Sequence, residues 1–514
     1  MPNYRNDDYR QCRLIAVNLE EQLVPGTFEY TLHYLIEHYL DLSDFDADYK
    51  NDSEGRPAYH PGVLLRIVLF AYSRGIFTSR QMAWHCERNV TFMALACHEA
   101  PHWTTIARFV SHHSSAITAL FERVLLVCEE QGLLGHELIA IDGCKMPSNA
   151  SKSHSGTFAE LGKKRDKIRA RIEHALAEHQ RFDAAGKEEA AEKAEQRVNT
   201  LKDAAESIDA FLKSESPRMG QGKKPREVKS NITDNESATM KTSHGVIQGF
   251  NGVSAVDKKH QVIVGTEVYG AGPEQQTLIP MLDSIQDCYE RLGVPLHFSS
   301  GEIIVTADTG FANEANMKHC HDNKINAYIP DNQFRSRDPR FTDHLKPASR
   351  KRKTKHKSTY PVSAFHYDPV NDTCRCPTGK LLRLKSVGED QHGNKKAFFE
   401  GRLTDCRVCE KKQHCMRNGE SADDRQGHGR QVSFMKEKKA SYTDWMRHRV
   451  DTDEGRAIYS HRMHVVEPVF GNIESNKGLN RFTLRTREKV RSQWQLFSLV
   501  HNIEKLQRYG RIAA

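Results

Sequence analysis

Two short apolar segments, far apart in the chain, each run directly into an aspartate, and this feature constrains the fold most. Residues 137–141 and 302–307 are rich in branched side chains and are followed by Asp142-Gly143 and Asp308-Thr309-Gly310. Such runs are typical of buried strands. Because strand-like and helical patterns alternate around them, we expect an α/β or mixed α+β fold, with both aspartates at a sheet edge where ligands bind.

A third acidic candidate lies near the C-terminus, in a basic stretch with helical periodicity. Apolar residues recur there at i, i+3, i+4 and i+7, namely Val466, Val469, Phe470 and Ile473. Glu467 lies within this pattern, and Pro468 after it predicts a helix start or a kink. A lone glutamate among cations is commonly one arm of an ion-pair network. Two strand-end aspartates upstream favour the alternative, a third metal ligand, for which Glu474 on the same helical face is the rival.

The composition favours a polyanionic partner. The chain has 75 Lys and Arg against 67 Asp and Glu, a formal net charge of +8, which suits a phosphate backbone. Three carboxylates in a basic protein could hold two Mg²⁺ ions, which prefer oxygen ligands and promote phosphoryl displacement. The longest apolar run, residues 63–72, is short and contains Arg66, so we expect no membrane span.

Several motifs, in their order along the chain, resemble those of one enzyme family. They are Thr-Ile-Ala-Arg-Phe (105–109), Ala-Ile-Asp-Gly (140–143), Ser-Asn-Ala-Ser-Lys (148–152), Thr-Asp-Asn-Glu-Ser (233–237), Ile-Gln-Gly-Phe-Asn (247–251), Thr-Ala-Asp-Thr-Gly-Phe (306–311) and Val-Glu-Pro-Val-Phe-Gly (466–471). Together they resemble a DDE transposase of bacterial insertion sequences. The resemblance covers nearly the whole chain and implies an RNase-H-like catalytic core.

The resemblance implies a catalytic set and a reaction. Asp142, Asp308 and Glu467 would hold two Mg²⁺ or Mn²⁺ ions. Tyr459, Arg462 and Lys477 resemble the Tyr, Arg and Lys that contact DNA phosphates in related transposases. Their spacing departs from the best-known signature: four residues separate Arg462 from Glu467 instead of three, and Lys477 lies ten beyond Glu467 instead of seven.

The implied function is metal-dependent cleavage of double-stranded DNA at terminal inverted repeats, followed by strand transfer into target DNA. Because both element ends must meet, we expect a homodimer or larger assembly on DNA. Two alternatives remain: an RNase-H-like nuclease or resolvase that cuts without joining, and an inactive DNA-binding relic.

Further DNA contacts are predicted from cations and from a recognition-like helix. The segments 78–86 and 104–110 have the size of a helix–turn–helix, and each opens on a hydroxyl residue that could cap its helix. Thr105 and Arg108 would face DNA on the second segment, although an ordinary helical bundle fits equally well. The other predicted DNA-contacting cations are Lys145, Lys152, Arg481 and Arg485.

The sequence divides into five parts. We expect a helical DNA-binding domain at 1–135, a catalytic core at 136–156 and 216–333, and a helical hairpin inserted at 157–215. A basic, Cys-containing insertion follows at 334–450, and residues 451–514 form the C-terminal helices of the core, with the catalytic Glu.

The cysteines predict a reducing location and a possible structural metal. Twelve Cys in a long chain without a secretory signal argue against a disulfide framework, so we place the protein in the cytoplasm, associated with the nucleoid. Within the second insertion, a CxxC motif and two further cysteines could bind structural Zn²⁺. These four residues are Cys376, Cys406, Cys409 and Cys415; reduced cysteines in a loop are the alternative.

Overall fold

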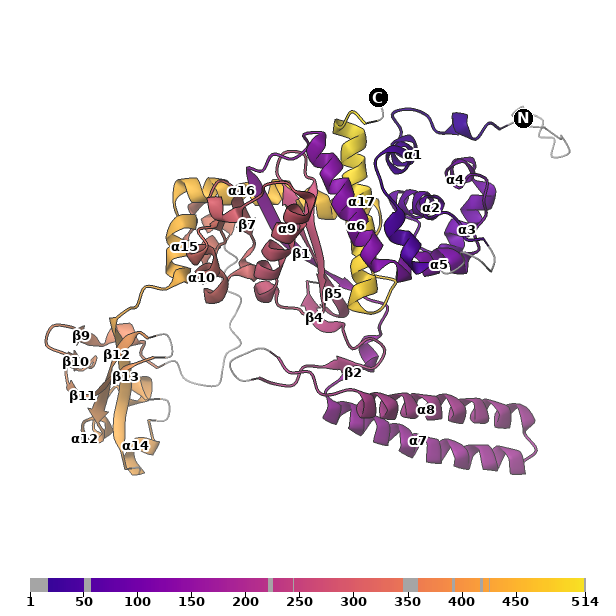
Figure 1. The fold of residues 1–514 in the computed structure, drawn as a ribbon. Helices are drawn as coiled ribbons and strands as arrows, with labels where there is room; N and C mark the ends of the chain where they lie inside the picture. The colour runs from indigo at the N-terminus through magenta and orange to yellow at the C-terminus, as the bar shows by residue number, and fades with distance from the viewer. Residues whose placement is uncertain are drawn as a thin grey trace, which may run out of the picture. The chain divides into compact units, whose positions relative to one another are not determined.

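The computed structural model describes residues 17–49, 57–220, 225–243, 245–344, 359–390, 393–416, 419–424 and 426–512. The chain forms two compact units, Met1–Pro330 with Thr452–Ala514, and Asp331–Asp451. Each unit combines helices with a β-sheet (Figure 1), which confirms the predicted mixed α/β class. No helix among the described residues has the length and apolar character needed to cross a membrane.

The N-terminal part of the first unit is helical. Its helices are α1 (Phe28–His38), α2 (Pro61–Ser73), α3 (Ser79–Arg88), α4 (Val90–Leu95), α5 (Trp103–His112) and α6 (Ser114–Glu130). Helix α2 is buried on nearly every face. The ring of Tyr72 at its end stacks on Phe497 of the last helix, α17 (Arg487–Tyr509), with 4.3 Å between ring centroids. This contact joins the N-terminal helices to the C-terminal end of the chain.

The predicted helix caps are half right. Thr78 caps α3 by accepting a hydrogen bond from the backbone of Gln81, as expected. For α5 the predicted hydroxyl cap is wrong, because the helix begins at Trp103 and its cap is His102. The His102 Nδ1 atom accepts the Thr104 N–H, which satisfies one donor of the first turn.

A mixed six-stranded sheet forms the centre of the first unit. Its strands are β1 (Leu138–Pro147), β4 (Ala238–Thr242), β5 (Gly245–Asp257), β6 (Ile263–Tyr269), β7 (Ile304–Ala307) and β8 (Asn326–Tyr328). The order is β4-β5-β1-β7-β8, and β6 also pairs with β5. Strand β1 is antiparallel to β5 and parallel to β7, and β8 is parallel to β7. The two predicted aspartate-bearing strands, β1 and β7, are therefore neighbours. Strand β1 does not end at Asp142 as predicted, because its pairing with β5 continues to Pro147.

Strand β5 runs without a break through Asn251-Gly252. The apolar runs 246–250 and 253–256 by themselves predict two separate strands, with an interruption between them. Instead Gly252 continues the strand beneath the indole of Trp494, where an added Cβ would lie 3.0 Å from the ring. The Trp494 Nε1–H donates to the Val253 carbonyl at 3.4 Å. Here Gly is a packing residue that lets α17 approach the sheet.

Helices cover both faces of this sheet. Trp494 of α17 packs over Gly252, whereas Met281 and Ile285 of α9 (Leu278–Leu292) pack over Gly265 of β6. Gly265 pairs with Ala255, three residues from Gly252, and residues an odd number apart on a strand face opposite sides. Helices α17 and α9 therefore lie on opposite faces. Helix α10 (Glu314–Asp322) connects β7 to β8.

Pro468 does not begin a helix, contrary to one of the two predicted outcomes. It lies inside α16 (Asp453–Gly471), which continues into a π-helical turn, Asn472–Asn476. Proline has no N–H to donate four residues back, to the carbonyl of His464. The side-chain amide of Gln261 donates to that carbonyl at 2.9 Å, which explains how the helix tolerates the proline.

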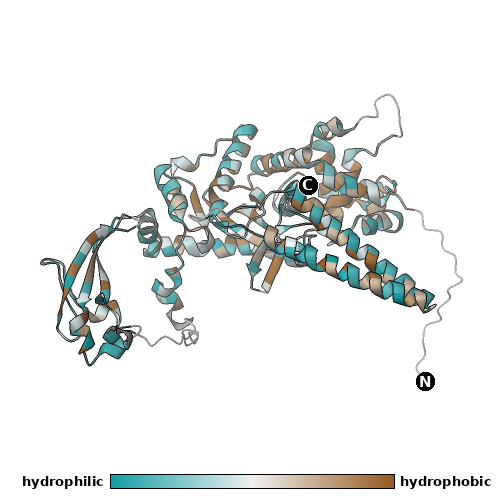
Figure 2. Ribbon diagram, turned by 90° about the horizontal axis from the view of Figure 1, so that it is seen from below, coloured by the Kyte–Doolittle hydropathy of each residue, from teal (hydrophilic) through white to brown (hydrophobic). Residues whose placement is uncertain are grey.

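Two long helices follow β1 and the short strand β2 (Ser155–Gly156). They are α7 (Phe158–Ala184) and α8 (Glu188–Ser214), joined at Ala185–Lys187. Hydrophilic and hydrophobic residues alternate along both helices (Figure 2). Near the base, Leu161, Ile208 and Phe211 form a small buried cluster. Apolar residues of the two helices thus pack against each other.

The second unit contains a five-stranded sheet in the order β13-β12-β11-β10-β9. The strands are β9 (His366–Asp368), β10 (Thr373–Arg375), β11 (Leu381–Glu389), β12 (Lys395–Arg402) and β13 (His428–Glu437). The short helices α12 (Leu403–Arg407), α13 (Lys412–Cys415) and α14 (Ser421–Asp424) connect β12 to β13. The core includes Phe365, Leu382 and Phe399.

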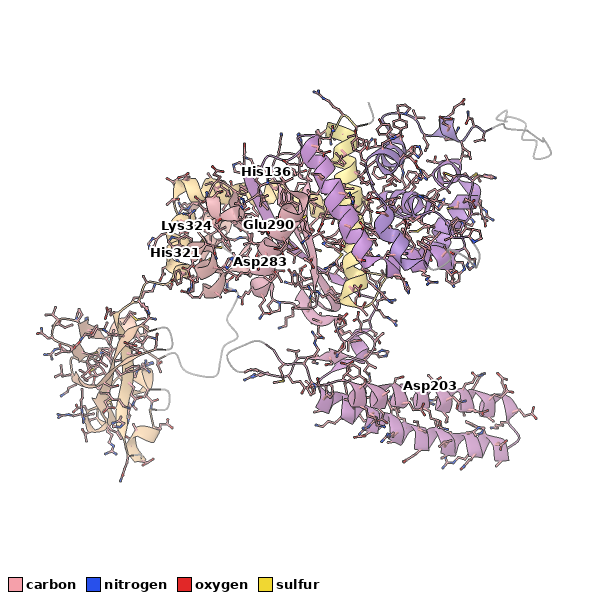
Figure 3. The ribbon with its side chains drawn as sticks, viewed as in Figure 1. His136, Asp203, Asp283, Glu290, His321 and Lys324 are labelled. Atoms are coloured by element: carbon pink, nitrogen blue, oxygen red, sulfur yellow. The ribbon has the colours of Figure 1, made fainter. Side chains whose placement is uncertain are left out.

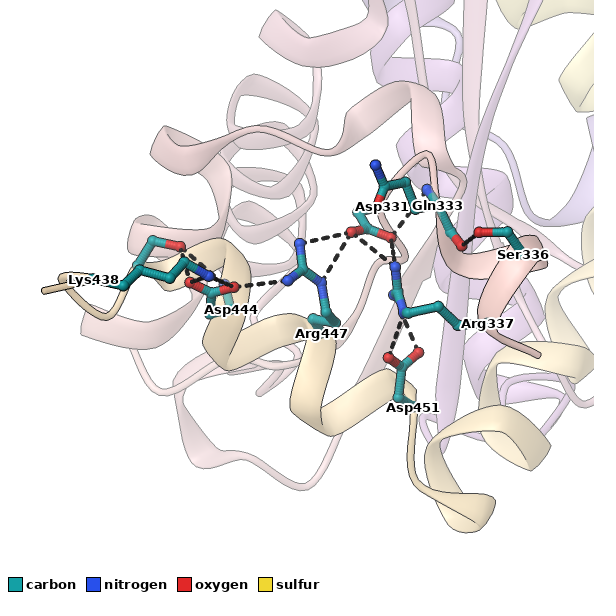
Figure 4. Close-up of polar contacts among 9 residues, drawn as sticks. Asp331, Gln333, Ser336, Arg337, Lys438, Asp444, Arg447 and Asp451 are labelled. Atoms are coloured by element: carbon teal, nitrogen blue, oxygen red, sulfur yellow. Dashed lines mark hydrogen bonds and ion pairs between the residues drawn. The ribbon is translucent and has the colours of Figure 1, made fainter. Parts of the chain in front are cut away.

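An ion-pair network joins the two ends of the second unit (Figure 4). At its centre, Asp331 pairs with Arg337 of α11 (Phe334–Arg337) at 2.8 Å and with Arg447 of α15 (Tyr442–Val450) at 3.0 Å. Arg337 also pairs with Asp451 at 2.7 Å. Burial raises the pKa of Asp331, but the hydrogen bonds from the two arginines outweigh it and hold that pKa below its usual value. The network therefore holds α11, near the start of this unit, against α15, near its end.

We expect Asp331→Asn to weaken the contact between α11 and α15. Removing one partner of a largely buried network should lower the free energy of unfolding of the unit by about 1–3 kcal/mol. Faster hydrogen exchange in α15 and a lower urea midpoint are the measurements. Because the folded-state pKa of Asp331 is lowered, its contribution is present above the unfolded value, about 3.9, and disappears as pH falls through the folded value.

Asp423→Asn is the matched control, since it breaks an ion pair with Lys412 in the same unit, in which the Asp423 side chain is 51% exposed. Little change is expected there. Equal hydrogen-exchange rates in α15 for the native protein and Asp331→Asn would show that the network does not stabilise the contact between α11 and α15.

Candidate active site

Asp142 and Asp308 occupy equivalent positions on neighbouring parallel strands. The last paired residues of β1 and β7 are Ile141 and Ala307, and each aspartate is the next residue in its strand direction. Neighbouring strands lie about 4.8 Å apart. The charge of Asp308 accordingly raises the pKa of Asp142. The structure thus brings together two of the three predicted catalytic carboxylates.

The Asp142 carboxylate is largely buried, with 15% of its side chain exposed, and it pairs with Arg462 of α16. One guanidinium N–H donates to Oδ2 at 2.5 Å, and the Gly143 N–H donates to Oδ1 at 2.8 Å. Burial, opposed by Arg462 and assisted by Asp308, raises the pKa of Asp142 to about 6. At neutral pH this carboxylate is therefore mainly ionised.

The Thr-Gly that follows Asp308 has a steric explanation. Asp308 caps a short 3₁₀ turn, Thr309–Phe311, and accepts the N–H of Gly310. A Cβ at residue 310 would lie 2.9 Å from Asp308 Oδ1 and 2.2 Å from Oε2 of Glu274. Only glycine leaves room for both carboxylates, so residue 310 permits the close approach of acidic groups.

Glu274 is a site residue that the sequence reasoning missed. It lies in a 3₁₀ turn, Glu274–Gln276, between β6 and α9. Its carboxylate pairs with Lys145 of β1 at 2.9 Å and accepts a hydrogen bond from Asn251 of β5 at 3.4 Å. No periodicity or motif marks this residue. The one indirect signal was the glycine at 310, whose neighbour could be identified only in three dimensions.

Glu467 lies on α16 with an exposed side chain. Before it, Arg462 contacts Asp142; after it, Glu474 accepts a hydrogen bond from the Cys144 thiol, two residues beyond Asp142. Burial and the neighbouring Glu474 raise the pKa of Cys144. Glu467 thus lies between two residues that contact β1, namely Arg462 of α16 and Glu474 of the π-helical turn after it, and Glu474 is the glutamate whose own side chain contacts the strand.

The predicted Tyr, Arg and Lys occupy different environments. The Arg462 guanidinium lies over the ring of Tyr459, 5.9 Å from its centroid, beside Asp142. Lys477 is 1% exposed, and its ammonium pairs with Glu504 of α17 at 2.6 Å. Burial, opposed by Glu504, lowers the pKa of Lys477. This placement makes Lys477 part of the core, and it does not support the predicted phosphate contact.

The other predicted DNA-contacting cations lie around the segment that follows β1. Arg481 and Arg485 are exposed and donate to the carbonyls of Ser148 and Asn149 at 3.1 and 2.9 Å. Lys152 is exposed and donates to the Val246 carbonyl at 3.3 Å. These bonds use part of each donor set only. Arg481, Arg485 and Lys152 therefore place positive charge along the segment that follows Asp142 in the chain.

Helix α5 presents a polar line on the N-terminal helices. Thr104, Arg108 and His112 are exposed and follow one another at four-residue intervals, whereas Thr105 is half-buried. Residues at this spacing lie on one face. Arg108 is thus available to a ligand, and Thr105 is less so.

The four predicted zinc-binding cysteines line one cavity of the second unit. Cys376 follows β10, Cys406 lies in α12, Cys409 follows it, and Cys415 ends α13. Burial raises the pKa of Cys415, and the other three thiols add to this effect. In the described part of the chain, no three acidic, thiol or imidazole groups form a ready-made metal centre, so the zinc and magnesium sites both stay predictions.

Two family models match the chain. One, described as a transposase DDE domain, matches residues 375–507, which include Tyr459, Arg462 and Glu467. The other, described as Transposase domain (DUF772), matches residues 17–112, which include helices α1 to α5. No curated protein and no solved structure gives a significant match. The matched families support the resemblance seen in the sequence motifs, that of a DDE transposase of insertion-sequence type.

Proposed function

We propose that this protein cuts DNA at the ends of its own mobile element and transfers the released strand into target DNA, in a metal-dependent reaction. The observation that carries the proposal is the pair Asp142 and Asp308, at equivalent positions on parallel strands and neutralised in part by Arg462. The mixed sheet that holds them is consistent with the RNase-H-like core implied by the sequence resemblance.

Asp142, Asp308 and Glu467 would hold the ions. Burial, assisted by the charge of Asp308, raises the pKa of Asp142 to about 6. A divalent cation bound at Asp142 and Asp308 would stabilise their ionised carboxylates. Bound Mg²⁺ or Mn²⁺ would supply Lewis-acid stabilisation of the phosphoryl displacement. Arg462 keeps Asp142 ionised and oriented, and Gly310 leaves the acidic groups room to approach.

DNA would be bound by two parts of the first unit. The exposed face of α5, with Arg108, would read the terminal inverted repeats. The cations around the site, including Lys145, Lys152, Arg481 and Arg485, would contact phosphates of the strand being cut. We place Tyr459 beside Arg462 in this contact. A dimer or larger assembly would bring both element ends together.

The decisive experiment is cleavage of a labelled duplex that carries the element's own end, with Mg²⁺ or Mn²⁺. We expect Asp142→Asn to lower the cleavage rate by about 100-fold or more, on the scale of losing one catalytic group, while DNA binding persists. Asp283→Asn makes the same chemical change at an exposed position of α9 (Figure 3) and should leave the rate unchanged.

Three other results have clear meanings. Cleavage that survives Asp142→Asn contradicts the proposed active site. Cleavage by the native protein without joining to target DNA points to a nuclease or resolvase. Binding without cleavage by the native protein points to an inactive relic.

A second comparison identifies the third carboxylate. We expect Glu467→Gln to abolish metal-dependent cleavage and Glu474→Gln to reduce it much less, because the Glu474 carboxylate already accepts the Cys144 thiol. Glu290→Gln on α9 (Figure 3) is the surface control. If Glu474→Gln has the larger effect, Glu474 is the third catalytic carboxylate instead of Glu467.

We further propose that the cavity lined by Cys376, Cys406, Cys409 and Cys415 binds one structural Zn²⁺. Thiolates are preferred zinc ligands, and four of them complete a tetrahedral site. Elemental analysis of protein purified without chelators should give one zinc per chain, and Cys406→Ser should lose it and become more sensitive to protease within the second unit. Cys97→Ser, at an exposed cysteine of α4's C-terminal turn, should retain it. Native protein that stays free of zinc after zinc addition would contradict this proposal.

A further inference from the structure

The first half of α7 carries a line of exposed cations. Lys163, Lys167 and Arg171 follow one another at four-residue intervals and are all exposed. Four residues correspond to a rise of about 6 Å and slightly more than one turn, so the three side chains form one stripe along the helix. We call these three residues the α7 stripe.

Other cations of the same helix are engaged by the protein. Arg165 pairs with Asp209 of α8 at 3.0 Å, and Arg169 binds the same carboxylate. The Lys164 ammonium donates to the Ser153 carbonyl at 2.5 Å. Within the described residues, no hydrogen bond or ion pair involves a side chain of the α7 stripe; Lys163 only contributes a weak attraction to Glu160. Apart from that attraction, the described protein offers the three charges of the stripe no ion-pair or hydrogen-bond partner.

Contacts at the base of the hairpin fix the start of the helix that carries this stripe. Thr157 and Glu160 form a reciprocal capping box at the start of α7. The Phe158 N–H donates to Glu227 at 2.5 Å, and the Phe158 ring contacts Phe211 of α8, with centroids 5.9 Å apart. Binding of a ligand to the stripe would therefore cost little backbone conformational entropy.

More cations adjoin the base. Lys152 and Lys229 are exposed next to β2 and β3 (Ser230–Asn231), and these strands pair with each other. Lys229 lies 3.6 Å from Glu160. Strand β1, which carries Asp142, leads to Lys152 in ten residues. Positive charge thus continues from the segment after the candidate site to the hairpin.

We propose that the α7 stripe binds the phosphate backbone of duplex DNA, outside the sequence read by the N-terminal helices. The spacing fits: successive cations are about 6 Å apart along the helix, and every second phosphate of one strand is about 6.8 Å apart along the duplex axis. Such contacts hold DNA in register without reading its sequence. The identity of this partner rests on the proposed transposase function.

The test compares two triple variants by the salt dependence of binding to a duplex carrying the element end and its flank. Lys163→Gln with Lys167→Gln and Arg171→Gln removes the stripe. The control, Lys193→Gln with Lys202→Gln and Lys213→Gln, removes the same charge from exposed positions of α8. Losing three phosphate contacts should reduce the magnitude of the slope of log K against log salt by about 2.7. The reduction should be similar for duplexes of unrelated sequence. The control variant should keep the native slope.

A charge-preserving variant separates the stripe's role from folding defects: Lys163→Arg with Lys167→Arg and Arg171→Lys should restore the native slope. Equal slopes for the native and stripe variants overturn the inference while cleavage by the native protein leaves the proposed function standing. Equal reductions in both triple variants also overturn it, because net charge alone would then explain binding. A change in oligomeric state with an unchanged slope identifies a second copy as the partner instead. Native protein that neither binds nor cuts DNA overturns the proposed function as well.

Discussion

The buried ion pair between Arg462 and Asp142 is the interaction on which the arrangement of the candidate site depends. The two residues are 320 positions apart in the chain and meet at 2.5 Å between α16 and β1. Burying Asp142 beside Asp308 disfavours its charge, and Arg462 opposes that effect. Because a buried charge without a partner is strongly destabilising, α16 must pack where its arginine reaches β1. The position of Glu467 on the same helix follows from this contact.

The C-terminal helix α17 gives this arrangement its support. Trp494 lies over Gly252, and Asn502 bonds both the N–H and the carbonyl of Ile263 at 2.8 and 2.9 Å. Tyr72 from the N-terminal helices stacks on Phe497 of the same helix. One helix, residues 487–509, therefore packs against the sheet and against the N-terminal helices, and it holds together segments that are far apart in the sequence.

Local patterns predicted the elements well where one physical signal dominated. Branched residues before Asp142 and Asp308 gave both strands, and the capping residue Thr78 gave the start of α3. The same reasoning was wrong where a distant side chain changed the local preference. Gly252 continues β5 because an indole packs on it, and Pro468 stays within α16 because Gln261 replaces a lost backbone partner. His102 took the capping position expected of Thr104.

The sequence by itself determined the family resemblance, the two aspartates that follow strand-like runs and the basic character of the chain, because motif order, strand pattern and charge can be read without knowing which residues meet in space. The tertiary structure decided which charges are neutralised. It buried Lys477 against Glu504, joined Arg462 to Asp142, and brought Glu274 and Glu474 to the residues around β1. Electrostatic energy depends on distance and burial, which residue spacing cannot supply for groups hundreds of positions apart.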